Sequence, residues 1–281
     1  MSLRPLLILT ALLSFSNIAK AAKPAPQRIA SFCLGCDEIL WELLRTDRNR
    51  IVGLSHLADD KVYSAIAEEV PAKLASLGDN MEYLAQLKPD LVILASYNRP
   101  EIALTVKKLG VTAVTLQRFN TFNDIVDNIR TLGRATGKTR EANDLVESMN
   151  AQLKTLAAEY AKASVKPTVL NFSADGTIWG AGSLFDEIVS KAGGSNLALT
   201  LGIKGWPVVN VERIATLNPD FIVVATADNP LDFNLKTMAG WKIMPAVKRN
   251  KIIEIRPAWL HSVSHHIVKA VHALHQGLYA R

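Results

Sequence analysis

MEYLAQLKPDLVILAS, at residues 81–96, has a second copy, VERIATLNPDFIVVAT, at residues 211–226. The two copies share a glutamate, an alanine, a leucine, the Pro-Asp pair and a late alanine, and both continue with an apolar run. In each copy, apolar residues at helical spacing precede a proline that cannot continue a helix. The unbroken apolar run that follows is typical of a strand covered on both faces. The repeated unit therefore predicts helix, tight turn and buried strand, the components of a parallel α/β lobe.

A second pair of matching segments supports a duplication. DEIL at residues 37–40 corresponds to DEIV at residues 186–189, in the same order relative to the longer copies. Two matches in the same order predict two related lobes, which we place at residues 27–138 and 165–281. Further strands are predicted from apolar runs at residues 28–32, 51–55, 112–116, 168–172 and 251–255.

One long helix is predicted between the lobes, at residues 139–164. Apolar residues recur there at steps of three and four, and neither glycine nor proline interrupts the segment. At about 1.5 Å per residue the helix would span roughly 39 Å, enough to brace both lobes. The alternative is a helix packed on one lobe with a flexible link after it. Lys166-Pro167 begins the next strand almost at once and leaves no long linker, which favours the brace.

The N-terminus has the pattern of a secretory signal peptide at residues 1–22. Arg4 supplies the positive start, residues 6–15 are a short apolar core, and Ala19-Lys20-Ala21 is a small-x-small cleavage site. No cysteine stands at that site, so we expect a free periplasmic protein rather than a lipid-anchored one. The formal charge of +6 is scattered along the chain and forms no basic cluster, which argues against nucleic-acid binding.

Several further motifs resemble the helical-backbone (class III) periplasmic binding proteins of ABC importers, which bind ferric siderophores, haem and vitamin B12. The motifs, in order, are RIAS at 28–31, LKPDLV at 87–92, AGGSN at 192–196, GWPVVNVE at 205–212, NPD at 218–220 and PAVK at 245–248. The resemblance covers nearly the whole mature chain. It implies two α/β lobes with mainly parallel sheets, joined by one long helix, and a ligand held in the cleft between them. It also implies no catalysis and no cofactor of its own, and we expect a monomer.

The same resemblance implies how the protein would dock. The family meets arginines of the permease dimer through one acidic residue on each lobe, at the start of the helix before the Pro-Asp strand. Those positions are Glu82 and Glu212 in this chain. A carboxylate in the first turn of a helix also interacts favourably with the helix dipole. The alternative is that both are ordinary acids on a solvated helix face.

The ligand is expected at the carboxyl ends of the strands, where open α/β sheets bind their ligands. Aromatic side chains would form apolar walls, and cationic or imidazole groups would anchor the ligand. The candidates in the loops after the predicted strands are Cys33, His56, Tyr97, Arg99, Arg118, Phe119, Trp179, Trp206, Trp259 and His261. For each aromatic residue, packing within a lobe is the alternative.

The ligand that we expect is a ferric siderophore or a similar metal chelate, with cobalamin and haem as alternatives. Trp206 and Trp259 match aromatic cleft positions of the family's vitamin B12-binding member. Ala258, however, stands where that member has an acidic residue, and Leu77 or Ser96 replaces an aromatic wall of its first lobe. These departures weigh against cobalamin without excluding it.

The sequence also allows two hypotheses from other classes of protein. The Cys33-x-x-Cys36 pair lies between a strand and a helix, where a thiol-disulfide oxidoreductase keeps its reactive cysteines. A structural disulfide or a thiol pair that faces the ligand is the other interpretation. The second reading is a free zinc- or manganese-binding protein that uses His56, His261 and Asp228. Hydrolytic motifs such as Gly-x-Ser-x-Gly and His-Glu-x-x-His do not occur in the chain.

Overall fold

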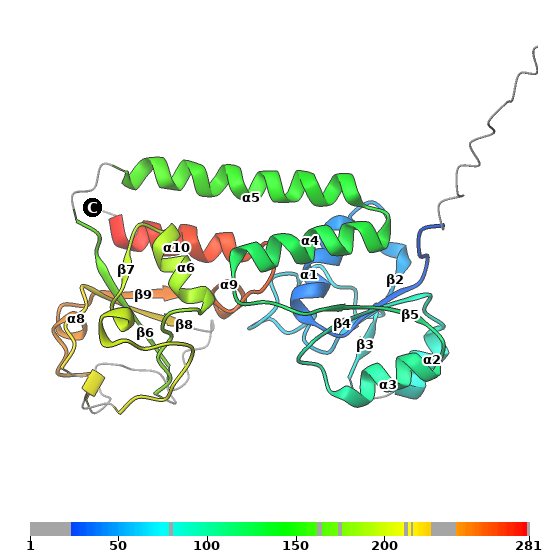
Figure 1. Cartoon of the computed structure of the whole chain (residues 1–281), viewed down its shortest axis with the longest axis horizontal. Coiled ribbons are helices and arrows are strands. Elements are labelled where there is room, and N and C mark those ends of the chain that lie inside the picture. The colour runs from blue at the N-terminus through cyan, green and yellow to red at the C-terminus, as the bar shows by residue number, and fades with distance from the viewer. Residues whose placement is uncertain are drawn as a thin grey trace, which may run out of the picture.

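The computed structural model describes residues 24–78, 81–161, 165–173, 176–210, 213–214, 216–225 and 240–279. The expected signal peptide, Glu212 and Asp228 lie outside these described residues. The chain forms two α/β lobes side by side, with one long helix running along both of them (Figure 1).

The first lobe is built on a parallel five-stranded sheet in the order β3-β2-β1-β4-β5. Its strands are β1 (Ile29–Ser31), β2 (Ile51–Ser55), β3 (Ala75–Leu77), β4 (Leu91–Ala95) and β5 (Thr112–Leu116). All five residues of β4 are buried, as the unbroken apolar run predicts. The helices of this lobe are α1 (Leu34–Leu43), α2 (Met81–Leu87), α3 (Pro100–Lys108) and α4 (Phe122–Thr136), with a 3-10 turn η1 (Arg48–Arg50) before β2.

The second lobe repeats this plan with four parallel strands in the order β7-β6-β8-β9. The strands are β6 (Thr168–Phe172), β7 (Ser195–Asn196), β8 (Phe221–Ala225) and β9 (Ile252–Ile255). The helices are α6 (Leu184–Lys191), α8 (Pro245–Lys248), α9 (Pro257–Leu260) and α10 (Ile267–Tyr279), with a 3-10 turn η2 (Leu197–Leu201). The two sheets therefore correspond strand by strand: β2-β1-β4-β5 has the order of β7-β6-β8-β9. The prediction of two lobes with parallel sheets is confirmed.

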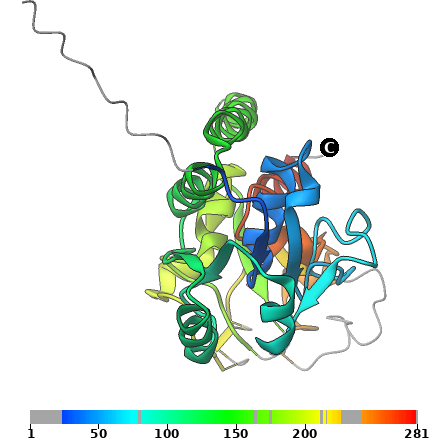
Figure 2. The same ribbon diagram turned by 90° about the vertical axis from the view of Figure 1, so that its right-hand side faces the viewer.

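The connecting helix is α5 (Thr139–Tyr160). It packs on α4 of the first lobe and on α6 and α10 of the second, and Figures 1 and 2 show it along the outer side of both. Its buried residues, Ala142, Val146, Met149 and Leu156, follow the three- and four-residue spacing seen in the sequence. The helix therefore lies across both lobes. The predicted range ended at residue 164, and residues 162–164 lie outside the described part.

The turn between the repeated helix and its strand has a strained backbone. Lys88, between α2 and Pro89, has φ of 46°, a left-handed conformation that is uncommon for a residue with a side chain. Proline after it disfavours the right-handed helical region at this position. The Arg28 side chain donates to the carbonyl oxygens of Leu87 and Lys88, at 2.6 and 3.1 Å, and ties the turn to the start of β1.

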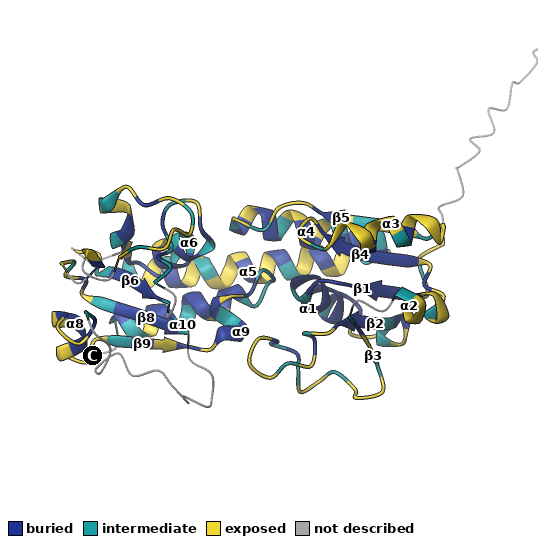
Figure 3. Ribbon diagram, turned by 90° about the horizontal axis from the view of Figure 1, so that it is seen from below, coloured by how far each residue is buried: buried dark blue, intermediate teal, exposed yellow. Residues whose placement is uncertain are grey.

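The short edge strands β3 and β7 were not predicted. Each has three residues or fewer, so neither carries enough residues for a periodic pattern. Figure 3 shows most strands as buried, whereas α4 and α5 carry both buried and exposed residues. Within the described part of the chain, no helix is both long enough and apolar enough to cross a bilayer.

Candidate functional site

The carboxyl ends of the two sheets meet where the lobes touch. Glu38, in the helix after β1, accepts hydrogen bonds from Ser262 and Ser264, which follow β9. Glu187, in the helix after β6, accepts one from the backbone N–H of Phe122, which follows β5. Segments that follow strands of both sheets therefore meet at the junction between the lobes.

An aromatic cluster spans this junction. The rings of Trp179 and His261, both in the second lobe, lie 5.2 Å apart, edge to face. The ring of Tyr63, from the first lobe, lies 6.5 Å from His261. We call these three residues the junction cluster. Desolvation lowers the pKa of His261, which favours its neutral imidazole form.

Tyr63 belongs to the junction cluster but was not predicted. It lies in the irregular segment between β2 and β3, where the sequence shows no periodic pattern. Its side chain is 49% exposed. The sequence shows only a tyrosine in a segment without a periodic pattern. The fold is what places its ring 6.5 Å from that of His261.

A second aromatic pair lies at the end of the first sheet. The rings of Tyr97 and Phe119, which follow β4 and β5, are 5.1 Å apart. Tyr97 is 59% exposed, whereas Phe119 is half-buried and packs against the main core. The surroundings raise the pKa of Tyr97 to about 12, through desolvation first and the nearby Asp37 second, so its hydroxyl stays protonated and can donate. His56, after β2, is exposed.

Trp206 projects from a ribbon of the second lobe and is 54% exposed. The ribbon is held by hydrogen bonds from Gly180 N to Gly205 O and from Gly205 N to Ala181 O, both 2.9 Å long. Gly205 has φ of 65°, which glycine adopts without strain. Because Trp179 directly precedes Gly180, the ribbon brings the backbone at Trp206 beside the segment that carries Trp179.

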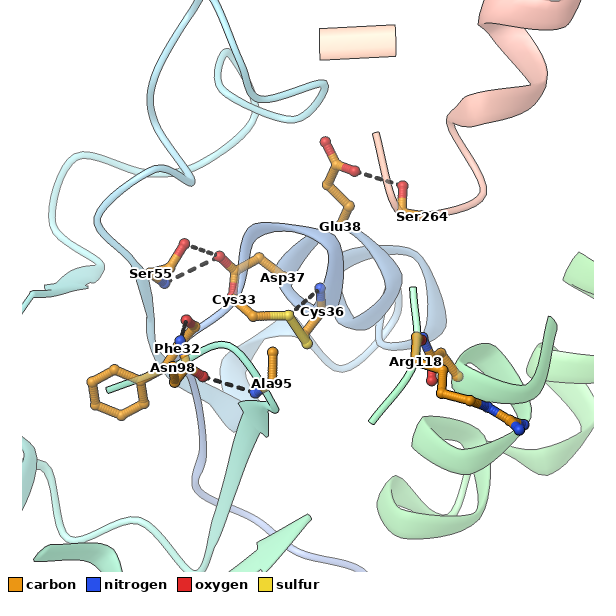
Figure 4. The surroundings of a disulfide bond; sticks show 11 residues. Phe32, Cys33, Cys36, Asp37, Glu38, Ser55, Ala95, Asn98, Arg118 and Ser264 are labelled. Carbon is orange, nitrogen blue, oxygen red and sulfur yellow. Dashed lines mark hydrogen bonds between the residues drawn. A yellow bond between two sulfur atoms is a disulfide. The ribbon is translucent and has the colours of Figure 1, made fainter. Parts of the chain in front are cut away.

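Three other predicted residues make contacts of their own. The Arg118 guanidinium pairs with Asp124 at 3.1 Å and Asp127 at 3.4 Å, both in α4, and its side chain points away from the disulfide (Figure 4). It lines a cavity of about 520 Å³ along β5 and α4. Arg99 is exposed and lies 3.7 Å from Glu101. Trp259 is half-buried and packs on the core.

Cys33 and Cys36 form a disulfide at the start of α1 (Figure 4). Cys33 is the N-cap of the helix, and its sulfur accepts from the N–H of Cys36 at 3.1 Å. The two side chains are 2% and 0% exposed. Sulfur atoms enclosed in this way offer almost no surface to an attacking thiolate, which argues against the oxidoreductase hypothesis. The same burial argues against Cys33 as a residue that contacts the ligand.

Asp37 is a buried carboxyl group beside this disulfide. Its Oδ2 accepts from the Ser55 backbone at 3.1 Å and from the Ser55 hydroxyl. Burial raises the pKa of Asp37 to about 8, although the hydrogen bonds from Ser55 act against that rise. Asp37 is therefore largely uncharged at neutral pH.

Glu82 is exposed in the first turn of α2, whereas its counterpart Glu212 is not described. In the described residues, no three His, Cys, Asp or Glu side chains gather into a group that could hold a metal ion. Neither His56 nor His261 therefore belongs to a metal-binding group among the residues that the structure places.

Comparisons with known proteins agree on one family. A family model described as "Periplasmic binding protein" matches residues 29–258. The ABC transporter substrate-binding lipoprotein YvrC of Bacillus subtilis, itself described as uncharacterized, is 26% identical over 94% of this chain and 83% of its own length. The vitamin B12-binding protein of Yersinia pseudotuberculosis is 25% identical over 98% of this chain and 94% of its own.

A solved structure supports the fold. The apo form of the periplasmic haem-binding protein RhuT from Roseiflexus sp. RS-1 matches with a TM-score of 0.76, over 90% of this chain and 98% of that chain. The sequence identity is 20%, so this likeness concerns the architecture of the two lobes.

Proposed function

The chain belongs to the periplasmic binding protein family, and we propose that it captures a metal chelate between its lobes and presents it to the permease of an ABC importer. Family membership confirms the resemblance drawn from the sequence, including the class with one long helix between two lobes. One relative is named as an ABC transporter substrate-binding lipoprotein and another as a vitamin B12-binding protein.

The junction cluster carries the proposal. Trp179, His261 and Tyr63 gather aromatic and imidazole surface where the lobes meet. Flat apolar walls with a few polar groups suit the organic shell of a chelate, which buries its rings and directs its oxygens to hydrogen-bond donors. Tyr97 and Trp206 expose further aromatic surface in loops of the two lobes. A ferric siderophore is the ligand class that we propose first.

Cobalamin is the second candidate. The relative named as a vitamin B12-binding protein spans 98% of this chain, and Trp206 stands at one of the aromatic positions that suggested this ligand from the sequence. Cobalamin presents a large corrin face, which aromatic side chains would cover by stacking.

The purified mature protein should be titrated by tryptophan fluorescence with a catecholate and a hydroxamate chelate of iron, ferric citrate, cyanocobalamin and haemin. Saturable quenching by one member at micromolar or lower concentration is the expected result. Quenching by none of the five, with the protein folded, would refute the proposed capture of a chelate.

Delivery to the permease is proposed through Glu82 and Glu212. The repeat puts both glutamates at the same place in their copies, and Glu82 lies exposed in the first turn of its helix. Export through residues 1–22 would place the protein in the periplasm. Both proposals rest on the sequence, because Glu212 and the N-terminal segment lie outside the described residues.

A further inference from the structure

Each lobe places one glutamate carboxylate against the other lobe, at matching positions of the repeat. Glu38 lies in α1, directly after the first strand of its sheet, and Glu187 lies in α6, which follows the corresponding strand of the second sheet. These are the glutamates of the repeated DEIL and DEIV segments. Each reaches into the opposite lobe, so the duplication has kept both the residue and its direction of contact.

Glu38 connects three parts of the molecule. Its Oε2 accepts from the hydroxyls of Ser262 and Ser264 in the second lobe, at 3.1 and 2.5 Å. Its Oε1 accepts from the backbone N–H of Ala65 at 2.9 Å. The residue is 1% exposed. A buried carboxylate with three donors is costly to leave unpaired, which favours one arrangement of these parts.

Glu187 makes the corresponding contact in the other direction. Its Oε2 accepts from the backbone N–H of Phe122 at 3.1 Å. Phe122 is the first residue of α4, whose N–H has no partner within its own helix. Lys191, one turn after Glu187, places its Nζ 4.8 Å from the centre of the Phe122 ring. One face of α6 thus holds both the backbone and the ring of Phe122.

The two contacts are related by the internal repeat. Glu187 binds the start of the helix that follows β5, and Glu38 binds the segment after β9, just before α10. Strands β5 and β9 occupy equivalent places in their sheets. The contact at Glu38 also adjoins the junction cluster, since Ala65 is two residues from Tyr63 and Ser262 follows His261.

We propose that Glu38 and Glu187 are a matched pair of positioning residues that fix the angle between the lobes and thereby hold the junction cluster ready for its ligand. The part concerning the ligand rests on the proposed function, whereas the part concerning the angle does not. A protein that spends less time in its binding-competent arrangement binds more weakly by the same factor. Loss of both carboxylates should therefore weaken binding.

The angle can be tested without any ligand. Spin labels on Lys107→Cys in α3 and Lys248→Cys in α8 would report the distance between the lobes, since both positions are exposed and the two native cysteines are paired in the disulfide. E38A and E187A should each broaden or shift the distance distribution, and the double variant should do so most. E187Q keeps an oxygen that can accept from Phe122 and should restore the wild-type distribution.

A matched control is the E42A variant. Glu42 lies one turn after Glu38 in α1 and pairs with Arg45 on the surface at 3.8 Å. The distance distribution of this variant should equal that of the wild type. Circular dichroism would verify folding, and S264A, which removes a donor from the opposite lobe, replaces E38A if that variant does not fold. Unchanged distributions in the folded E187A variant and in E38A or its replacement would overturn the proposal.

The ligand part has its own readout. The probe is the one among haemin, cyanocobalamin, ferric citrate and the two iron chelates that binds the wild type. The Kd of the E38A/E187A double variant for this probe should be about tenfold higher than that of the wild type, as expected if the binding-competent fraction falls to about one tenth. A shifted distance with an unchanged Kd would refute the link to binding. Failure of the wild type to bind any probe would refute the proposed function, while the distance measurement would still decide on the angle.

Discussion

The carboxylate of Glu38 accepts a hydrogen bond from the hydroxyl of Ser264, a residue 226 positions later in the chain and in the other lobe. Burial raises the pKa of Glu38, and hydrogen bonds from Ser264, Ala65 and Ser262 counteract that rise. A buried, hydrogen-bonded carboxyl group thus lies at the junction between the lobes, beside the aromatic side chains that we propose as the ligand site.

Replacing Trp179 with alanine should weaken ligand binding about tenfold, because it removes an aromatic wall and the ring that orients His261. Tyr63→Ala should weaken binding in the same direction, and Tyr63→Phe, which keeps the ring, should have a smaller effect. Calorimetric titration with the ligand found in the fluorescence panel measures both. Trp41→Phe, a buried change in α1, is the control. Equal affinity in the Trp179→Ala variant and the wild type would make Trp179 a packing residue.

Glu82→Ala combined with Glu212→Ala should abolish ligand uptake by cells while leaving the affinity of the purified protein unchanged. The reason is that the proposed docking pairs involve the permease and not the ligand. Each single variant should give partial uptake. Glu101→Ala, an exposed acid in α3, serves as the control on the same lobe. Normal uptake by the double variant would contradict the docking role.

Asp37 should make the protein less stable as the pH rises. Its pKa is raised from 3.8 to about 8 on folding, so the folded state holds the proton more tightly than the unfolded state. The stabilisation is complete below about pH 4 and is lost between about pH 4 and pH 8, with a slope near 1.4 kcal/mol per pH unit for one proton.

The D37N variant isolates this effect, since asparagine is uncharged at every pH and can still accept from Ser55. The free energy of unfolding from urea titrations should fall more steeply with pH in the wild type than in D37N. Glu38 and Tyr97 lie near enough to interact with Asp37 and are present in both proteins. Parallel pH profiles would mean that Asp37 is already ionised in the folded state near neutral pH.

Gly35→Ala should destabilise the junction, because a Cβ at this position would lie 2.5 Å from Cγ2 of Val263 and 3.2 Å from its carbonyl oxygen. Overpacking of this kind costs about 1–3 kcal/mol, visible as a lower midpoint of thermal unfolding. Val263→Ala removes the nearer atom and should recover part of the loss in the double variant. Gly78→Ala, where a Cβ meets no atom within 4 Å, is the control for replacing a glycine. Additive effects of Gly35→Ala and Val263→Ala would show that the two residues do not press on each other.

The helices and strands and their duplication could be predicted from the sequence alone. Strands β2, β4, β5, β6 and β8 lie at their predicted residues. For β4 and β8 the signal is an unbroken apolar run directly after a Pro-Asp pair. The repeat also determined that two lobes exist and that their sheets are parallel, since a helix between successive buried strands favours that connection. Both predictions depend on patterns within short stretches of the sequence.

Which loop residues face one another could not be predicted from the sequence and follows from the packing of the two lobes. Arg118, which the sequence predicts as a ligand anchor, pairs with Asp124 and Asp127 of α4. Tyr63 was missed, and the matching glutamates were read only as a sign of duplication. Their contacts join segments far apart in the chain, so they depend on the angle between two folded lobes, and no local pattern in the sequence encodes that angle.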